Sequence, residues 1–283
     1  MTKNIAVDTT KQYYDSNDAD NFYFEIWGGE DIHIGIYKDN KETIFDASRR
    51  TVQEMASRLK TLDASSKVLD IGSGYGGAAR FLAKNYKCHV TALNLSSVEN
   101  ERNRKMTKEQ ELASLIKVVD GNFESIPVED ASFDFVWSQD AILHSSDREK
   151  VCEEVARVLK PGGEFIFTDP MQADNCPSDK LQPIYDRIHL ESLGTPGFYR
   201  DTFNKLGMKE LCYEDHLKQL STHYFRVLKE TEKQEDILKE KVSSDYIANM
   251  KKGLQHWVDG SEKGYLAWGI FHFVKPGPKK KDK

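Results

Sequence analysis

The sequence predicts an α/β fold built on a doubly wound parallel sheet, and three observations lead to this expectation. Short apolar runs alternate with longer amphipathic runs, which is the βαβαβ rhythm of parallel strands joined by right-handed crossovers. The first apolar run, residues 68–71, passes directly into a glycine-rich turn and then a helix. An unusually aromatic run, residues 266–274, reads as a last strand.

Each element is expected from its local pattern. Buried strands are predicted at 68–71, 88–94, 115–119, 133–138, 164–168, 208–214 and 266–274. Helices are predicted at 77–86, 97–115, 148–159 and 198–206. The sequence Lys160-Pro161-Gly162-Gly163 closes the third of these helices, as proline and glycine do at helix ends.

Two segments do not fit the rhythm of the sheet. Residues 1–62 carry clustered aromatic side chains, and residues 216–264 are charged and helix-prone. We therefore expect an N-terminal lid or arm at 1–62, a Rossmann-like core at 63–215, a helical cap insertion at 216–264, a final core strand at 265–276 and a disordered basic tail at 277–283. The alternative is that the arm and the insertion are surface helices without a role at the site.

Composition excludes several classes of protein. The 283-residue chain has a formal net charge of −6, which argues against nucleic acid as the main partner. No apolar run approaches the roughly 20 residues that span a bilayer, and no signal-like core starts the chain, so a cytoplasmic protein without a membrane partner is expected. The four cysteines share no metal or redox spacing, and no metal site is predicted. The oligomeric state, including a homo-oligomer, stays open.

The glycine-rich turn predicts a nucleotide-like ligand. Gly72, Gly74 and Gly77 let the backbone approach the ligand closely, but their spacing also satisfies the dinucleotide pattern. Asp70, at the end of the strand, would repel a pyrophosphate and tolerates a ligand with a cationic amino acid end. The pattern therefore indicates S-adenosylmethionine (SAM) as the cofactor.

Polar side chains follow the next strands at the same edge of the predicted sheet, where ligands bind in open α/β folds. Asn94 and Leu95 stand where the ribose hydroxyls are expected, and Asn122 and Phe123 where the adenine is expected. Turn chemistry for the two amides and core packing for Phe123 are the alternatives. Gln139 is expected to contact SAM.

The turn after the fourth strand holds two further candidates. His144 is a candidate base, or it ties down its loop through backbone hydrogen bonds. Asp140 is a candidate partner for the ammonium group of an acceptor.

Three blocks in the N-terminal part carry a resemblance to a known family. Gln12-Tyr13-Tyr14-Asp15, residues 18–35 (DADNFYFEIWGGEDIHIG) and residues 44–50 (IFDASRR) are similar to sarcosine/dimethylglycine N-methyltransferases. The resemblance implies a class I SAM-dependent methyltransferase with a Rossmann-like sheet, an N-terminal lid and a helical insertion before the last strand. It also implies two methyl transfers, from sarcosine to dimethylglycine and on to glycine betaine, with Ile32 and His33 beside the cofactor.

The resemblance assigns further roles residue by residue. Related phosphobase enzymes pair a tyrosine with the histidine, which matches Tyr13, or Tyr14, with His144. Related sugar enzymes pair the histidine with an acid after the fifth strand, which matches Asp169. Phosphobase enzymes hold the phosphate of the acceptor with basic and tyrosine residues; Arg187 matches one of these, and His189 replaces a tyrosine. Arg187 is also the expected carboxylate clamp, because its planar fork can bind a carboxylate through two hydrogen bonds. The aromatic faces expected to stabilise the growing positive charge are those of Tyr14, Tyr23 and Trp27.

Other interpretations remain open at this stage. Arg187 is alternatively a solvated helix arginine paired with Asp186 or Glu191. The fold could also act on a phosphobase, a phenol or a sugar, although the basic residue that phosphobase enzymes carry near the C-terminus has no counterpart around residues 256–259. A SAM-binding protein without catalytic activity is the interpretation from a different class.

Overall fold

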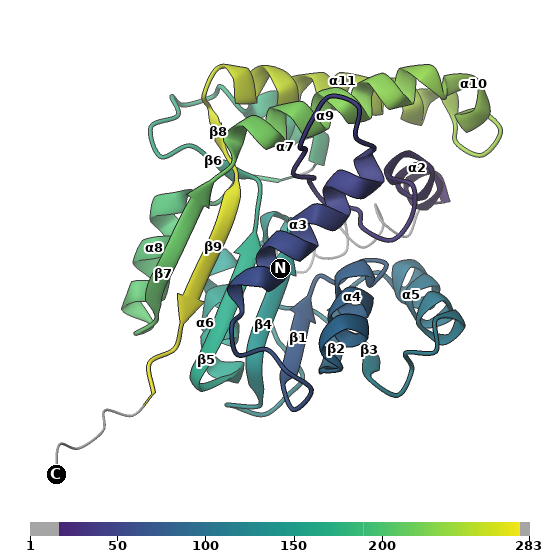
Figure 1. The fold of residues 1–283 in the computed structure, drawn as a ribbon. Helices are drawn as coiled ribbons and strands as arrows, with labels where there is room; N and C mark the ends of the chain where they lie inside the picture. Colours follow the sequence, from purple (N-terminus) through teal and green to yellow (C-terminus); the bar gives the residue numbers. More distant parts are fainter. Residues whose placement is uncertain (1–16, 189, 278–283) are drawn as a thin grey trace, which may run out of the picture.

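A computed structural model describes residues 17–188 and 190–277, and within them a seven-stranded sheet forms the centre of the molecule (Figure 1). The strand order is β3-β2-β1-β4-β5-β9-β7. The strands are β1 (Lys67–Ile71), β2 (His89–Asn94), β3 (Ile116–Asp120), β4 (Phe133–Gln139), β5 (Leu159–Thr168), β7 (Lys209–Asp215) and β9 (Gly269–Val274). Neighbours from β3 to β5 pair in parallel, and β9 runs antiparallel to both β5 and β7. The predicted doubly wound α/β sheet is confirmed.

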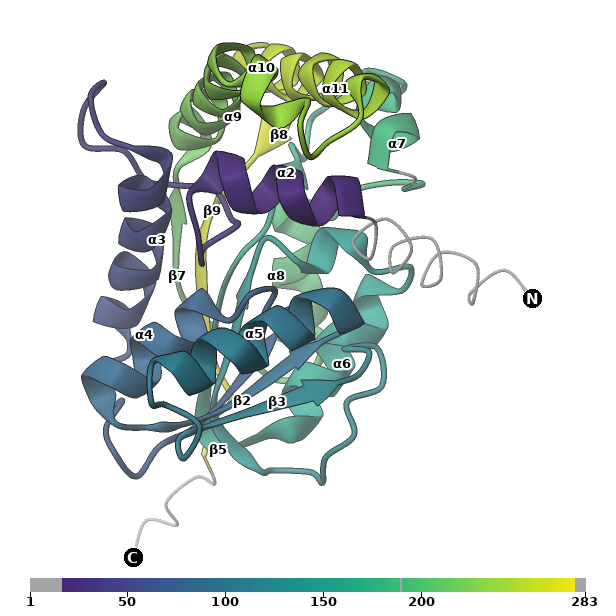
Figure 2. The same ribbon diagram turned by 90° about the vertical axis from the view of Figure 1, so that its right-hand side faces the viewer.

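Helices cover both faces of the sheet (Figure 2). On one face lie α3 (Ile44–Arg58), α4 (Gly77–Tyr86) and α5 (Ser97–Glu109), and on the other lie α6 (Arg148–Val158) and α8 (Pro196–Lys205). Alternate residues of a strand serve opposite faces. Val68 therefore packs in the cluster under α3 and α4, whereas Leu69 packs in the cluster with α6 and α8.

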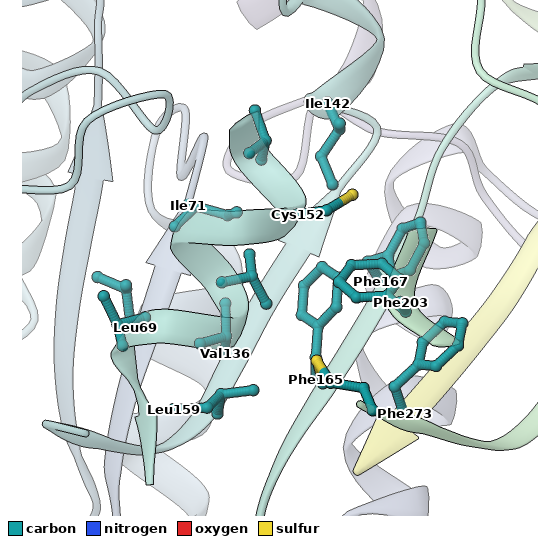
Figure 3. Packing of buried hydrophobic residues seen from close by; sticks show 14 of the residues in the cluster. Leu69, Ile71, Val136, Ile142, Cys152, Leu159, Phe165, Phe167, Phe203 and Phe273 are labelled. Carbon is teal, nitrogen blue, oxygen red and sulfur yellow. The ribbon is translucent and has the colours of Figure 1, made fainter. Parts of the chain in front are cut away.

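The core beneath α6 and α8 is rich in phenylalanine (Figure 3). Phe165 and Phe167 of β5 are stacked with ring centroids 4.6 Å apart, and Phe203 of α8 lies 5.4 Å from Phe165. Phe271 of β9 stacks on Phe167 at 5.2 Å. These rings are fully buried, so they hold the antiparallel strand β9 against the parallel part of the sheet through apolar burial as well as hydrogen bonds.

A helical layer lies above the carboxyl ends of the strands (Figure 1). It contains α2 (Asn17–Trp27), α7 (Gln182–Ile188), α9 (Leu217–Lys233), α10 (Glu235–Leu238) and α11 (Ser244–Glu262). Phe22 and Ile26 of α2 share one buried cluster with Val227 of α9 and Leu254 of α11. The N-terminal segment and the late insertion thus pack on each other, and that packing depends on residues more than 200 positions apart.

Most element boundaries agree with the sequence-based expectation within two residues, and three elements differ by more. Helix α5 ends at Glu109, because Glu111 takes a left-handed conformation with φ 58°. Strand β5 begins at Leu159, and residues 160–163 belong to it with a register shift opposite β4. The predicted strand at 266–274 is split at Trp268 into β8 (Leu266–Ala267) and β9, and β8 pairs with β6 (Met171–Gln172) in a separate ribbon. Among the described helices, none has the length and apolar composition to cross a bilayer.

Candidate functional site

Two adjoining cavities lie at the carboxyl edge of the sheet, beneath the helical layer. The first cavity is lined by the glycine-rich turn after β1 and by residues that follow β2, β3 and β4. The second cavity is lined mainly by α2, α7, α9 and α11. Both cavities are lined by Tyr23, Ile32, His33, Asp140 and His144. These shared residues mark a junction through which ligands in the two cavities would meet.

The glycine-rich turn is shaped by close approaches that only glycine allows. Gly72 has φ +73°, and a Cβ there would overlap the side chain of Ala141. Its backbone N–H donates to Leu93 O at 2.8 Å, which fixes the turn against the end of β2. Gly74 has φ +49° and faces Ile32, whose Cδ1 would lie 3.3 Å from an added Cβ. Gly72 therefore has a structural constraint, and Gly74 borders the cavity together with the predicted residue Ile32.

Two buried carboxyl groups flank this turn. Burial, reinforced by the charge of Asp31, raises the pKa of Asp70 to about 7, and within the described residues Asp70 Oδ2 has no hydrogen-bond partner. Asp31 lies 2.8 Å from Arg49 Nε and packs against Gly77, where any Cβ would overlap it. Both acids line the first cavity, so a cationic ligand group between them would gain charge pairing that the protein alone leaves incomplete. Asp31 lies inside the N-terminal block that carried the resemblance, but sequence reasoning did not single it out.

Helix α5 brings a carboxylate to the side chain of Asn94. Asn94 Nδ2 donates to Glu99 Oε2 at 2.8 Å, and both side chains line the first cavity. Ser96 caps α5 by accepting from the backbone N–H of Glu99 at 3.2 Å. Ser96 and Glu99 have the spacing of a helix capping box, so Glu99 belongs to the helix start as well as to the cavity wall.

The remaining residues predicted at the strand ends also line the first cavity: Leu95, Asn122, Phe123 and Gln139. Asn122 Oδ1 accepts from the backbone N–H of Glu124 at 2.8 Å, so this amide also closes its own turn. Asn122 therefore closes its own turn and also lines the first cavity, so the two interpretations do not exclude each other.

The junction is organised by Asp140, which has φ 50° directly after β4. Its Oδ2 accepts from the backbone N–H of Ile34 at 2.7 Å, and its Oδ1 accepts from Trp268 Nε1 at 2.8 Å. Burial raises the pKa of this carboxyl. Gln139 Nε2 lies 3.2 Å from His33 Nδ1, and His33 Nε2 lies 3.7 Å from Asp31 Oδ1. Asp140 therefore joins the N-terminal segment to the end of the sheet, besides facing both cavities.

His144 ends the short helix η1 (Ile142–His144) and lines both cavities. Burial, with a smaller contribution from the charge of Arg148, lowers its pKa to about 4, so the imidazole is neutral at pH 7. A neutral imidazole has a lone pair that accepts a proton or a hydrogen bond.

The predicted acid Asp169 directly follows β5, and it is hydrogen-bonded to the turn of His144 and to α8. Asp169 Oδ1 accepts from the backbone N–H of Leu143 at 2.9 Å, and Oδ2 accepts from the Tyr199 hydroxyl at 2.7 Å. Burial raises the pKa of this carboxyl to about 7. Asp169 lines neither cavity, because packing of α8 against β5 brings Tyr199 to its carboxyl group. Through the backbone N–H of Leu143, Asp169 holds the turn that carries His144.

The second cavity is walled by two aromatic pairs from opposite ends of the chain. Tyr23 and Trp27 of α2 have ring centroids 5.2 Å apart, and Tyr224 of α9 stacks on Trp257 of α11 at 5.1 Å. Tyr23 and Trp27 were predicted at this site. Tyr224 and Trp257 were not predicted, because their segment reads only as charged and helical. The predicted residues Tyr13, Tyr14 and His189 lie outside the described ranges.

The predicted clamp residue Arg187 lies in this second cavity. It extends from α7, and its guanidinium group contacts Met250 Sδ of α11. Asp186, the acid proposed as an alternative partner, accepts from Gln182 Nε2 at 2.7 Å. The guanidinium group is therefore held at the wall of the cavity, in contact with α11.

Comparisons with known proteins agree with this architecture. A family model described as a methyltransferase domain matches residues 69–167. The chain is 60% identical over 270 residues to a sarcosine/dimethylglycine N-methyltransferase of Halorhodospira halochloris, which covers 95% of this chain and 97% of the relative. It is 53% identical over 277 residues to the enzyme of that name from Aphanothece halophytica, and the match covers 98% of this chain and 100% of the relative.

A solved structure gives the same result. The crystal structure described as a sarcosine dimethylglycine methyltransferase from Galdieria sulphuraria has a TM-score of 0.89 and 44% identity, covering 94% of this chain and 100% of that one. The resemblance expected from the N-terminal blocks is thereby confirmed. The chain belongs to the family of sarcosine/dimethylglycine N-methyltransferases.

Proposed function

We propose that this enzyme transfers methyl groups from SAM to the nitrogen of sarcosine and then of dimethylglycine, forming glycine betaine. The observation that carries the proposal is the junction of the two cavities at His33, Asp140 and His144. The first cavity fits the methyl donor, and the second has groups for each end of a small amino acid.

The residues of the first cavity fit SAM. Asp70, which lacks a hydrogen-bond partner within the described residues, suits the cationic amino acid end, and the glycine-rich turn admits the ligand without a side chain in the way. Asn94 and Glu99 offer an amide and a carboxylate to the ribose hydroxyls, and Asn122 and Phe123 suit the adenine. SAM supplies a methyl group already activated on a sulfonium.

The residues of the second cavity fit a zwitterion. Arg187 offers a planar guanidinium group that can bind a carboxylate through two hydrogen bonds. The aromatic faces of Tyr23, Trp27, Tyr224 and Trp257 suit an N-methylated ammonium group, which is attracted to the negative face of a ring. A carboxylate held at Arg187 would direct the amine towards the junction.

His144 addresses the protonation of the acceptor. A secondary or tertiary alkyl amine has a pKa of about 10, so it carries a proton and has no free lone pair at pH 7. Neutral His144 is placed at the junction to take that proton. Burial also disfavours a bound ammonium group, so the acceptor gives up its proton more readily in the cavity than in water.

A panel of acceptors tests the proposed activity. We expect the purified protein with SAM to form S-adenosylhomocysteine with sarcosine and dimethylglycine, and glycine betaine to accumulate by NMR. Phosphoethanolamine, catechol and a hexose serve as control acceptors for the alternative substrate classes. Faster turnover of any of these controls would contradict the substrate assignment, and turnover of none would favour a binding protein without catalysis.

The pH dependence tests the role of His144. If His144 takes the proton from the bound ammonium form, kcat/KM for dimethylglycine should stay nearly flat from about pH 5 to 9, because neutral imidazole and ammonium are both abundant there. His144→Ala should lower kcat/KM by ~100-fold near pH 7 and make it rise about tenfold per pH unit. A loss of equal size at every pH would assign His144 to positioning instead.

Arg187 is tested through the acceptor KM. Arg187→Ala should raise KM for dimethylglycine by about 10-fold or more, since a charge-assisted hydrogen bond contributes roughly 1.5–3 kcal/mol. Arg187→Lys should recover only part of this loss, because a point charge cannot reproduce the planar fork. Affinity for S-adenosylhomocysteine, measured by calorimetry, should barely move in either variant. An unchanged KM in Arg187→Ala would assign the carboxylate to another group.

A further inference from the structure

Helix α11 has a glycine in its interior at a position where its backbone does not require one. Gly253 lies midway along Ser244–Glu262, is buried, and has no positive φ. Glycine destabilises a helix interior relative to alanine, so a buried helical glycine calls for a reason in its packing.

The side chain of Arg187 packs directly over this glycine. A Cβ at position 253 would lie 2.9 Å from Arg187 Nε, 3.1 Å from its Cγ and 3.2 Å from its Cδ. All three of the nearest atoms belong to Arg187. Met250, one turn earlier on the same helix face, contacts the end of the guanidinium group.

The same helix face forms part of the wall of the second cavity, where Met250, Gly253, Leu254 and Trp257 occur at helical spacing. Because Gly253 has no side chain, it leaves a gap, here called the notch, between the large apolar side chains of this wall. The notch lets Arg187 lie flat across α11 with its guanidinium group at the cavity. A methyl group in the notch would displace Arg187, since a flexible side chain moves more easily than two packed helices.

We propose that Gly253 is a positioning residue for the acceptor, because its missing side chain sets where the guanidinium group of Arg187 lies. This inference rests on the proposed binding of the acceptor carboxylate by Arg187. In this proposal Gly253 contacts neither reacting atom and acts only through Arg187.

The first test is Gly253→Ala. We expect KM for dimethylglycine to rise about threefold or more, part of the loss expected on removing the charge-assisted pair, with kcat at saturating acceptor and affinity for S-adenosylhomocysteine nearly unchanged. Gly260→Ala is the matched control, since Gly260 lies in the same helix and its Cβ would meet only apolar side chains at 3.3 Å or more. An acceptor KM in Gly253→Ala equal to that of Gly260→Ala would overturn the proposal.

A double-mutant cycle shows whether Gly253 acts through Arg187. In the Arg187→Ala background, Gly253→Ala should cause no further rise in KM, because the side chain that it displaces is gone. An equal rise in both backgrounds would overturn the proposal. If Gly253→Ala melts at a lower temperature than the wild type, Arg187→Ala should restore the melting temperature, and failure to restore it would also count against the proposal.

The cycle separates this inference from the proposed function. If the wild type methylates neither sarcosine nor dimethylglycine, the proposed function fails, and the melting temperatures of the four proteins still show whether residues 187 and 253 are coupled. If Arg187→Ala raises KM and Gly253→Ala does not, only the role of Gly253 is wrong.

Discussion

The carboxylate of Asp140 holds together the parts of the chain that form the site. It follows β4 with φ 50° and accepts one hydrogen bond from Ile34 in the N-terminal segment and one from Trp268 before the last strand. A buried carboxylate is costly unless it is hydrogen-bonded, so the three segments are held in one arrangement. The junction of the two cavities lies at this point.

The surroundings of the junction suit a reaction in which an amine gains methyl groups and keeps a positive charge. Carboxyl groups stand on the side of the first cavity, at Asp31 and Asp70, and aromatic faces stand on the side of the second. Both kinds of group stabilise a cation. A fully methylated nitrogen has no lone pair to accept a hydrogen bond, and neither kind of group has to donate one to it. Burial keeps His144 neutral, and Asp169 fixes the turn that carries His144 by accepting a hydrogen bond from Leu143.

Local patterns predicted the sheet, the glycine-rich turn and the strand-end residues, because strand periodicity and glycine conformations are determined by nearby sequence. Residues whose positions depend on packing between distant segments were not predictable in this way. Tyr224 and Trp257 meet only after α9 and α11 pack together, and the partner of Asp169 is set by how α8 docks. Glu99 was missed because it lies in helix α5 and not at a strand end, and only the fold brings it to Asn94.

The central claim is that the acceptor spans the second cavity with its carboxylate at Arg187 and its nitrogen at the junction. A crystal structure of the complete protein with S-adenosylhomocysteine and dimethylglycine tests it most directly. The account predicts both carboxylate oxygens on the Arg187 guanidinium group, and the amine nitrogen facing the sulfur of S-adenosylhomocysteine beside His144. Dimethylglycine bound with its carboxylate away from Arg187, or with its nitrogen outside the junction, would contradict it.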